Sequence, residues 1–584
     1  MTGIPLDEFG IDDLRDYRRF LPATVAHGRP QGREIPALTQ GRARLVVTAA
    51  IFCVAVLVIC ARLVDVMVLQ EATVTRLPHA ASTAYHASRA DIVDRNGVLL
   101  ATSLATASLY ADPKLILNVD DAVNKLTRLF PDLDRAELTE KLKSDKRFVW
   151  IKRNLTPHQH QQVFRLGLPG LDFEKEERRI FPTGSLLAHV VGLTGVDNHG
   201  MVGIESSYDK TLRGGIEPLH LSIDVRLQHI MRTELQASID EFKALGGAGI
   251  IMDVNTGEVL SLLSLPDFDP QNNNDIPPDA MFNRATLGTY ELGSVFKIFN
   301  SAMALDSGRI HLDDTFDTIH PIQAGRHTIK DYEKMHRWLS LAEIFQYSSN
   351  IGSVRIVQQM GIPAQRAFLD KVGLTTPSPI ELPEVGAPQV PNPWREVNSW
   401  TIAFGHGIAV SPMQLAAAAA STINGGIYHP PTLVQRDPAL PVPGHRVISP
   451  ETSDKMRRLF RLVVTSGTAS FAKVPGYVVG GKTGTADKVV GHGYGTKANR
   501  TTFVGVFPMN NPRYLVLALI DEPHADASTH GFATAGWIAV PVVGRVIKQM
   551  GPLVGIEPVN EDSPEIHQAL DINARPRSIA GATP

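Results

Sequence analysis

The sequence predicts a mixed α/β (α+β) fold for the second half of the chain, with an antiparallel sheet and a helical subdomain. Two pairs of apolar runs predict hairpins. GAGIIMDV and EVLSLLSL flank Asn255-Thr256-Gly257, and TTFVGVFP and RYLVLALID flank Asn510-Asn511-Pro512. Asn and Gly between apolar strands are typical of tight turns. Helical patterns lie between the two pairs, at 294–308, 339–350 and 411–425, so strands from both ends of one domain would share a sheet.

The region before this domain predicts a second, elongated α+β domain, the pedestal, over residues 70–226. Short strand-like runs alternate there with amphipathic helices. Asn96-Gly97 indicates a turn, and Thr156-Pro157 indicates the start of a helix. The sheet-bearing domain would then occupy residues 227–557. The polar, Pro- and Ala-rich residues 558–584 predict a disordered tail. The Gly-rich residues 489–499 predict a loop that connects two strands, with substrate binding as the alternative.

A long apolar run near the amino terminus predicts a single transmembrane anchor over residues 45–69. Residues 45–61 carry no charge, and a helix needs roughly 17–25 mostly apolar residues to cross a bilayer. Several arginines closely precede the run, which favours a cytoplasmic tail at 1–44 and an exported remainder. The alternatives are a buried soluble helix and a cleaved signal peptide. The uniformly apolar run argues against the first, and the long segment before it argues against the second.

Composition limits the other functions. The chain has 584 residues, and its formal net charge of -3 gives no basis for nucleic-acid binding. Its two cysteines, Cys53 and Cys60, both lie in the apolar run, so no disulfide is expected in the exported part. His158 and His160 are two residues apart on a helical pattern and would point to different faces. We therefore expect neither a metal nor a cofactor.

A candidate nucleophile, Ser294, opens the first helical pattern, with Lys297 three residues later. This spacing on a helix places the hydroxyl and the amine on one face. Serine is a poor nucleophile until a base takes its proton, and a lysine serves once burial or a nearby positive charge makes it neutral. The string alone proves little, because Ser207–Lys210 and Ser470–Lys473 share its spacing.

Two further strings single out Ser294. Ser348-Ser349-Asn350 follows at the end of a helical pattern, and Lys482-Thr483-Gly484-Thr485 follows on a predicted strand. An S-x-x-K string, a Ser–Asn string and K-T-G are together typical of penicillin-binding proteins and class A β-lactamases, whose serine is acylated.

An acyl-transfer site needs a nucleophile, a proton relay, an oxyanion hole and a grip on the substrate. We expect Ser294 and Lys297 to be nucleophile and base, and Ser348 to pass the proton to the leaving amine. The backbone N–H groups of Ser294 and Thr485 would stabilise the oxyanion. Lys482, with Thr483 and Thr485, would hold a terminal carboxylate. Gly484 would let an extended peptide approach the strand edge, and Asn350 would hydrogen-bond Lys297 or the substrate amide.

Beyond these motifs, the sequence resembles class B penicillin-binding proteins over nearly all of residues 40–555. YELGSVFK at 290–297 resembles that family's nucleophile segment, with Leu292 where Pro is more usual. RADIVDRNG, with Ala90 where Gly is common, and GMVGIE, NRAT, FGHGIAVSPMQL and GGKTGTADK resemble its other recurring strings. The ending VLALIDEP followed by AVPVVGRVI most resembles the division-specific, FtsI-type branch.

The resemblance implies a peptidoglycan D,D-transpeptidase that cross-links stem peptides during septum synthesis and is inhibited by β-lactam antibiotics. It also implies a single-pass protein of the bacterial inner membrane with a large periplasmic part. The implied partners are a membrane glycosyltransferase of the SEDS type (FtsW-like) and other division proteins.

Other functions remain as alternatives. An elongation-specific transpeptidase of the same family shares every motif. A β-lactamase or β-lactam sensor is a different class, but no E-x-x-L-N string supplies a deacylating base. A bifunctional enzyme would need a further glycosyltransferase domain, and a purely structural scaffold would not need three intact motifs.

Overall fold

The computed structural model describes Ala50 and residues 53–59, 89–272, 275–325, 327–490 and 493–572. The chain divides into two compact units, Met1–Ala84 and Tyr85–Pro584, and the second contains the expected domain at 227–557 and the expected pedestal except for residues 70–84. Ala50 and residues 53–59 are helical, and the rest of the expected tail at 1–44 and anchor at 45–69 lies outside the described residues. Among the described residues, no helix has the length and apolarity needed to span a bilayer.

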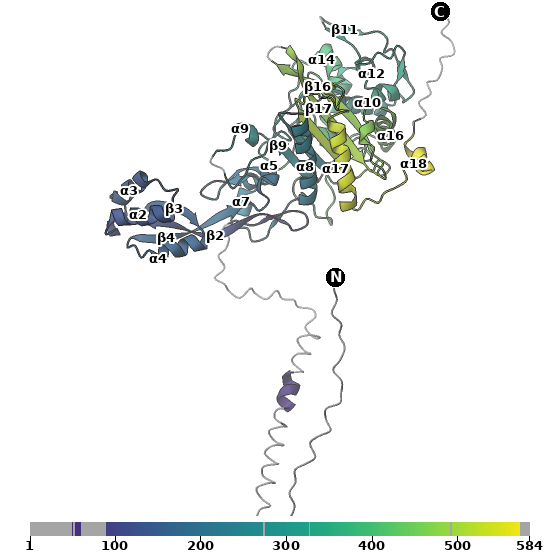
Figure 1. Cartoon of the computed structure of the whole chain (residues 1–584). Coiled ribbons are helices and arrows are strands. Elements are labelled where there is room, and N and C mark those ends of the chain that lie inside the picture. Colours follow the sequence, from purple (N-terminus) through teal and green to yellow (C-terminus); the bar gives the residue numbers. More distant parts are fainter. Residues whose placement is uncertain are drawn as a thin grey trace, which may run out of the picture. The chain divides into compact units, whose positions relative to one another are not determined.

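The pedestal is built around one long strand, β2 (Leu99–Ala111), seen at the purple end of the folded part in Figure 1. It pairs antiparallel with β1 (Ile92–Val93), β3 (Val149–Leu155) and β4 (Leu171–Ile180), and β1 also pairs in parallel with β7 (Leu219–His220). The expected Asn96-Gly97 turn separates β1 from β2, where Asp94 accepts from Val98 across it.

Three helices, α2 (Val119–Leu129), α3 (Arg135–Lys143) and α4 (Pro157–Arg165), cover this sheet with a small apolar core of their own. The expected helix start at Thr156 is confirmed. Its hydroxyl accepts from the backbone of Gln159, whose side chain accepts from the backbone of Thr156 in return, so two otherwise unpaired N–H groups are satisfied.

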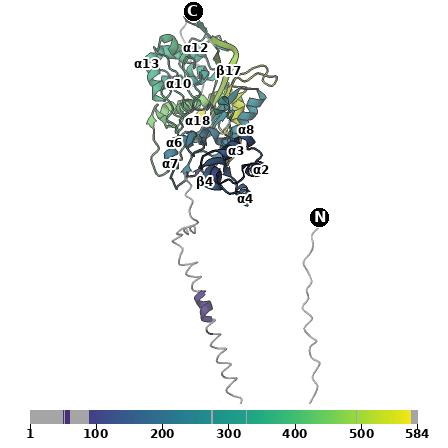
Figure 2. The ribbon, with the colours of Figure 1, turned by 90° about the vertical axis from the view of Figure 1, so that its left-hand side faces the viewer.

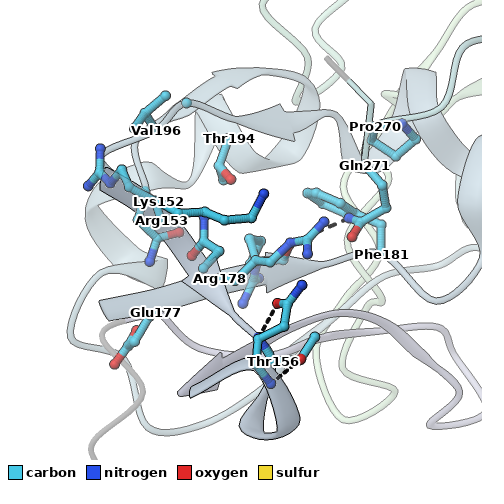
Figure 3. A pocket seen from close by; sticks show the side chains of 15 residues that line it. Lys152, Arg153, Thr156, Glu177, Arg178, Phe181, Thr194, Val196, Pro270 and Gln271 are labelled. Atoms are coloured by element: carbon cyan, nitrogen blue, oxygen red, sulfur yellow. Dashed lines mark hydrogen bonds between the residues drawn. The ribbon is translucent and has the colours of Figure 1, made fainter. Parts of the chain in front are cut away.

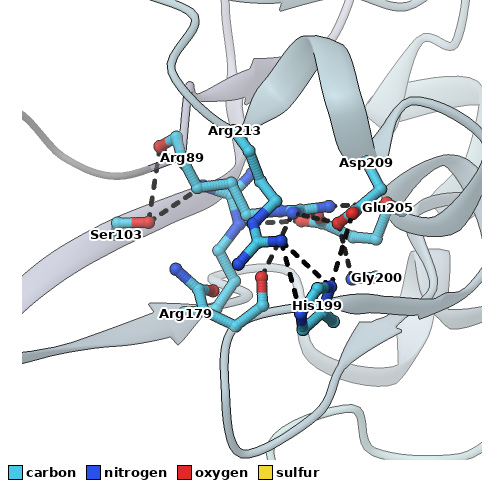
Figure 4. Close-up of polar contacts among 9 residues, drawn as sticks. Arg89, Ser103, Arg179, His199, Gly200, Glu205, Asp209 and Arg213 are labelled. Carbon is cyan, nitrogen blue, oxygen red and sulfur yellow. Dashed lines mark hydrogen bonds and ion pairs between the residues drawn. The ribbon is translucent and has the colours of Figure 1, made fainter.

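A buried ionic network ties the pedestal's sequence strings together (Figure 4). The Arg89 guanidinium contacts the carboxylate of Glu205 and lies 2.6 Å from Asp209, while Arg179 Nε lies 2.7 Å from the other oxygen of Glu205. Arg89 and Glu205 are fully buried. Burial of unpaired charges is costly, so the arginine of RADIVDRNG and the glutamate of GMVGIE require one another.

The second domain contains a five-stranded antiparallel sheet in the order β16-β17-β18-β8-β9. Its strands are β8 (Gly246–Asp253), β9 (Val259–Leu265), β16 (Gly480–Val490), β17 (Gly493–Phe507) and β18 (Tyr514–Asp521). Both predicted hairpins are present, and β18 pairs with β8 in the register Leu517↔Ile250. The first and last parts of the domain therefore share one sheet, as the sequence predicts.

Helices cover both faces of this sheet, which explains why all eight residues of β18 are buried. The helices α8 (Val225–Glu241) and α17 (Ala539–Leu553) pack together against one face, visible side by side in Figure 1. On the other face, α15 (Pro412–Ala420) packs on β8 and β18, and α16 (Pro450–Ser466) packs on β16.

The helical subdomain, between β9 and β16, contains the predicted helices with shifted ends; Figure 2 shows its α10, α12 and α13 together. The predicted helices are α10 (Lys297–Asp306), α11 (Leu341–Gln346) and α15, and the subdomain also contains α12 (Asn350–Met360) and α13 (Ile362–Lys371). Residues 297–305 of α10 are all buried, since neighbouring helices surround it. Leu339–Ser340, expected to begin a helix, instead forms the short strand β13.

Two expectations about irregular segments are wrong. Residues 489–499, expected to form a connecting loop, mostly extend β16 and β17 as a hairpin, with Asp487 opposite Asn499 and Val490 opposite Gly493. The predicted disordered tail is wrong for residues 558–572, because α18 (Pro564–Leu570) buries Leu570 and Glu561 lies 2.8 Å from Arg461. A short helix anchored by one apolar residue is too weak a pattern to detect in a polar sequence.

Candidate active site

The nucleophile segment is a tight turn that enters a buried helix. Ser294 lies in the 3-10 turn η4 (Gly293–Phe296), and α10 follows directly from Lys297. Gly293 has a φ of 61°, and a Cβ there would lie 2.5 Å from the carbonyl oxygen of Thr485. Only glycine therefore allows the turn to lie this close to β16, which places Ser294 beside the K-T-G strand.

Gly484 serves the same close packing from the opposite side. A Cβ at this position would lie 2.4 Å from the carbonyl oxygen of Leu292 and 2.9 Å from Val295 Cγ1. The approach that Gly484 permits is thus between β16 and the nucleophile segment. The expected role of this glycine, to let an extended peptide approach the strand edge, stays a prediction.

The amine of Lys297 is the centre of the site. Its Nζ lies 2.7 Å from Oγ of Ser294, 2.8 Å from Oδ1 of Asn350, and 3.1 Å from Oγ and 2.9 Å from the carbonyl oxygen of Ser348. The side chain is 1% exposed, whereas Ser294 is half-buried. Of the two expected partners for Asn350, the structure shows Lys297.

Ser348 occupies a position between two lysines. Its Oγ lies 3.1 Å from Nζ of Lys297 and 3.1 Å from Nζ of Lys482. Its φ of 61° is rare for a residue other than glycine, and such strain persists only where the surrounding structure imposes it. Ser348 belongs to the tight connection between α11 and α12. The first residue of α12 is Asn350.

Burial controls the charge of both lysines. It lowers the pKa of Lys297 well below its usual value, with a further lowering by the charge of Lys482 and an opposing effect of Asp331. Burial also lowers the pKa of Lys482 to about 7. A neutral amine beside Ser294 is the state in which a lysine accepts a proton.

The threonines of the K-T-G strand point away from Lys482, as alternation along a strand requires. Thr483 Oγ1 lies 2.7 Å from Oγ1 of Thr468 and is buried. Thr485 Oγ1 accepts from the backbone N–H of Ala535 at 3.1 Å, which leaves its own O–H to donate elsewhere. The structure thus brings all eight candidate residues to one end of β16, with Thr483 and Thr485 on a different face from Lys482.

Two residues of this site have no signal in the sequence. Thr468 follows α16 and contacts Thr483, and Asp331 follows β12 (His327–Ile329) and contacts the Ser349–Asn350 connection. Neither belongs to a motif or a periodic pattern, because both act across the fold. Among the described residues, no group of His, Cys, Asp or Glu side chains is arranged to hold a metal.

The two larger cavities found among the described residues lie outside this cluster. One of about 490 Å³ is lined mostly by pedestal residues, such as Lys152, Thr156 and Arg178, together with Gln271 of the second domain (Figure 3), and none of the eight candidate residues lines it. The other, of about 300 Å³, lies next to β16 beyond Thr485 and is lined in part by Glu291, Asp487 and Arg500. It provides space directly beside the nucleophile segment.

Comparison with known proteins identifies the two domains. The family model for the penicillin-binding protein transpeptidase domain matches residues 247–543, and that for the penicillin-binding protein dimerisation domain matches residues 84–225. The chain is 37% identical to a peptidoglycan D,D-transpeptidase FtsI of Caulobacter vibrioides, over 80% of this chain and 82% of that relative. It is 30% identical to the peptidoglycan D,D-transpeptidase FtsI of Escherichia coli, over 81% and 84% respectively.

Solved structures agree with this assignment. The transpeptidase domain of Burkholderia pseudomallei penicillin-binding protein 3 matches with a TM-score of 0.53 and 33% identity, over 58% of this chain and 98% of that one. Penicillin-binding protein 3 of Mycobacterium tuberculosis, solved in complex with aztreonam, shares the fold with a TM-score of 0.65 at 23% identity, over 84% and 99%. The dimerisation-type pedestal, the transpeptidase domain and the relatives together show that the chain belongs to the class B penicillin-binding proteins, beside the FtsI-type enzymes.

Proposed function

We propose that this protein is a peptidoglycan D,D-transpeptidase that joins stem peptides through an acyl-enzyme on Ser294, with release of D-alanine, during septum synthesis. The observation that carries the proposal is the 2.7 Å approach of the buried Lys297 amine to the Ser294 hydroxyl. The FtsI-type relatives support the reaction and the division role.

In the acylation step, the neutral amine of Lys297 accepts the Ser294 proton while Oγ attacks the carbonyl carbon of the penultimate D-alanine. The negative charge that develops on the carbonyl oxygen would be stabilised by the backbone N–H groups of Ser294 and Thr485, and the packing of η4 against β16 supports this pairing. Pre-positioned donors of this kind stabilise a transition state more than a ground state.

The proton then has a short path to the leaving group. Ser348 Oγ contacts both lysine amines, so it can pass the proton from Lys297 to the amine of the departing D-alanine. An incoming amine from a second stem peptide would return its proton by the same path as it attacks the acyl-enzyme.

The carboxylate of the donor peptide would be held by the charge of Lys482 and the O–H of Thr485. A carboxylate close to Lys482 favours its protonated form, so binding of the substrate would offset part of the cost of burying this amine. A β-lactam presents a carboxylate and a reactive carbonyl to the same groups, and its ring opening would leave Ser294 acylated.

The cellular setting completes the proposal. The apolar run at 45–69 would anchor the protein once in the bacterial inner membrane, with residues 1–44 in the cytoplasm and the folded domains in the periplasm. There the enzyme would act with other division proteins and with an FtsW-like glycosyltransferase of the SEDS type. It would cross-link the stem peptides on the glycan that this glycosyltransferase makes.

A fluorescent penicillin tests the nucleophile. We expect covalent labelling of the wild-type protein and no labelling of Ser294→Ala. Ser207→Ala is the matched control, because Ser207 and Lys210 repeat the S-x-x-K spacing in the pedestal, and it should label like the wild type. Persistent labelling of Ser294→Ala would overturn the proposal.

An elongation-specific transpeptidase is the second candidate, since it shares the same motifs. Depletion of the protein in its own bacterium separates the two. Filamentous cells are expected for a septal enzyme, and rounded or swollen cells would instead assign the protein to elongation.

A further inference from the structure

Asp331 makes three contacts to the connection that carries Ser348 and Asn350. Its Oδ2 accepts from Oγ of Ser349 at 2.6 Å, and its Oδ1 accepts from the backbone N–H groups of Asn350 at 2.6 Å and Ile351 at 2.9 Å. These are the first two N–H groups of α12, which have no partner within the helix. The carboxylate therefore caps α12 from a separate segment, where the helix dipole favours a negative charge.

The same segment fixes the orientation of the Asn350 amide. The carbonyl oxygen of Lys330 accepts from Nδ2 of Asn350 at 3.2 Å, so Oδ1 faces the opposite way and meets Nζ of Lys297 at 2.8 Å. With the amide reversed, two N–H donors would face the lysine and no acceptor would be available. Lys330 and Asp331 thus determine which atom Lys297 encounters.

Asp331 also places a negative charge close to the site. Two ionisable groups on other elements act on the Lys297 amine, Lys482 from β16 and Asp331 from the segment after β12. Its other polar neighbours, Ser294, Ser348 and Asn350, are uncharged. Burial and Lys482 lower the pKa of Lys297, and Asp331 opposes both.

We propose that Asp331 is a positioning residue for the acyl-transfer reaction, which holds the Ser348–Asn350 connection in register and adds a negative charge near the Lys297 amine. The inference rests on the proposed function of Ser294 and Lys297. Asp331 does not touch the reacting atoms, and it acts through Asn350, Ser349 and its charge.

Three variants separate the effect of the Asp331 charge from its positioning of the Ser348–Asn350 connection. Asp331→Asn keeps the shape and removes the charge, and Asp331→Ala removes both. Asp134→Asn is the matched control, because Asp134 accepts from the first turn of α3 in the pedestal at 2.8 Å. Each variant is made in the full chain, and its melting temperature is measured beside its rate of acylation by fluorescent penicillin as a function of pH.

The acylation rate should rise with pH as Lys297 loses its proton, and this rise is the acid limb of the pH–rate profile. Because Asp331 raises the pKa of Lys297, Asp331→Asn should shift this acid limb to lower pH. Asp331→Ala should in addition lower the maximal rate by about 10- to 100-fold, since a displaced proton relay is costly. Asp134→Asn should leave both the limb and the rate unchanged.

The outcomes distinguish this inference from the function on which it rests. Lower melting temperatures with an unchanged acid limb would assign Asp331 a structural role only and overturn the proposal, as would wild-type rates in both variants. In either case, loss of labelling in Ser294→Ala would leave the proposed nucleophile intact. If Asp331→Ala fails to fold, the position of the acid limb in the pH–rate profile of the near-isosteric Asp331→Asn still tests the proposal.

Discussion

Nζ of Lys482 lies 3.1 Å from Oγ of Ser348, and the lysine side chain is completely buried. The lysine proposed to hold the substrate carboxylate therefore also contacts the proposed proton relay. Its burial lowers its pKa to about 7.

Stability should therefore increase with pH. Between about pH 7 and the usual lysine value of 10.5, the unfolded chain protonates Lys482 and the folded chain does not. Because the unfolded state binds more protons there, the free energy of unfolding rises with pH across this window. Urea unfolding at pH 7 and pH 9 measures the slope, and Lys482→Met should have a smaller one. An identical slope in the variant would contradict the lowered pKa.

Replacing Lys297 should abolish most acylation without unfolding the protein. Lys297→Met removes the proposed base, and removal of a base lowers rates about 10²- to 10⁴-fold. The variant should melt no lower than the wild type, since a buried amine is exchanged for an apolar chain of similar length. Stopped-flow acylation by a penicillin gives the rate, and Lys473→Met, from the S-x-x-K string outside the site, should behave like the wild type.

Gly484→Ala should damage the site through packing. The added Cβ would lie 2.4 Å from the carbonyl oxygen of Leu292, so β16 and the nucleophile segment must separate. Such overpacking costs about 1–3 kcal/mol of stability and should slow acylation as well. Gly195→Ala is the control, because its Cβ would lie 3.4 Å from its nearest neighbour, Met201 Sδ. Normal acylation by Gly484→Ala would argue against the tight contact.

Arg89→Met tests the pedestal network. The change leaves Arg179 as the remaining ion-pair partner of the buried Glu205 among the described residues, and it removes the 2.6 Å contact to Asp209, so we expect a loss of about 3 kcal/mol or more. Arg147→Met, which removes an exposed pair with Asp112, should cost under about 1 kcal/mol. Thermal unfolding compares the two. Penicillin labelling of Arg89→Met at low temperature should persist, because Ser294 lies in the other domain.

The sequence predicted the other candidate residues around Ser294, because each of their motifs indicates a local structure. S-x-x-K indicates one helical face, and K-T-G lies on a strand between apolar runs. The role of Asp331 was missed because a cap supplied from a distant segment has no characteristic spacing. The left-handed Ser348 and the packing of Gly484 were missed for a similar reason, since tertiary contacts impose both. The hairpin at 489–499 and helix α18 lack the alternating or periodic apolar pattern that reveals an element.

The pairing of β18 with β8 also has a consequence for how the protein is made. The two strands are separated in the chain by the whole helical subdomain, so β8 is synthesised long before its partner. Until β18 is available, the hairpin of β8 and β9 presents an open edge on which foreign strands can add. Such long-range pairing also slows folding, since a large loop must close first. Lys482 of β16 is in turn held in place by a sheet that is complete only when nearly the entire polypeptide has been made, so we expect no acylation by a chain that ends before β18.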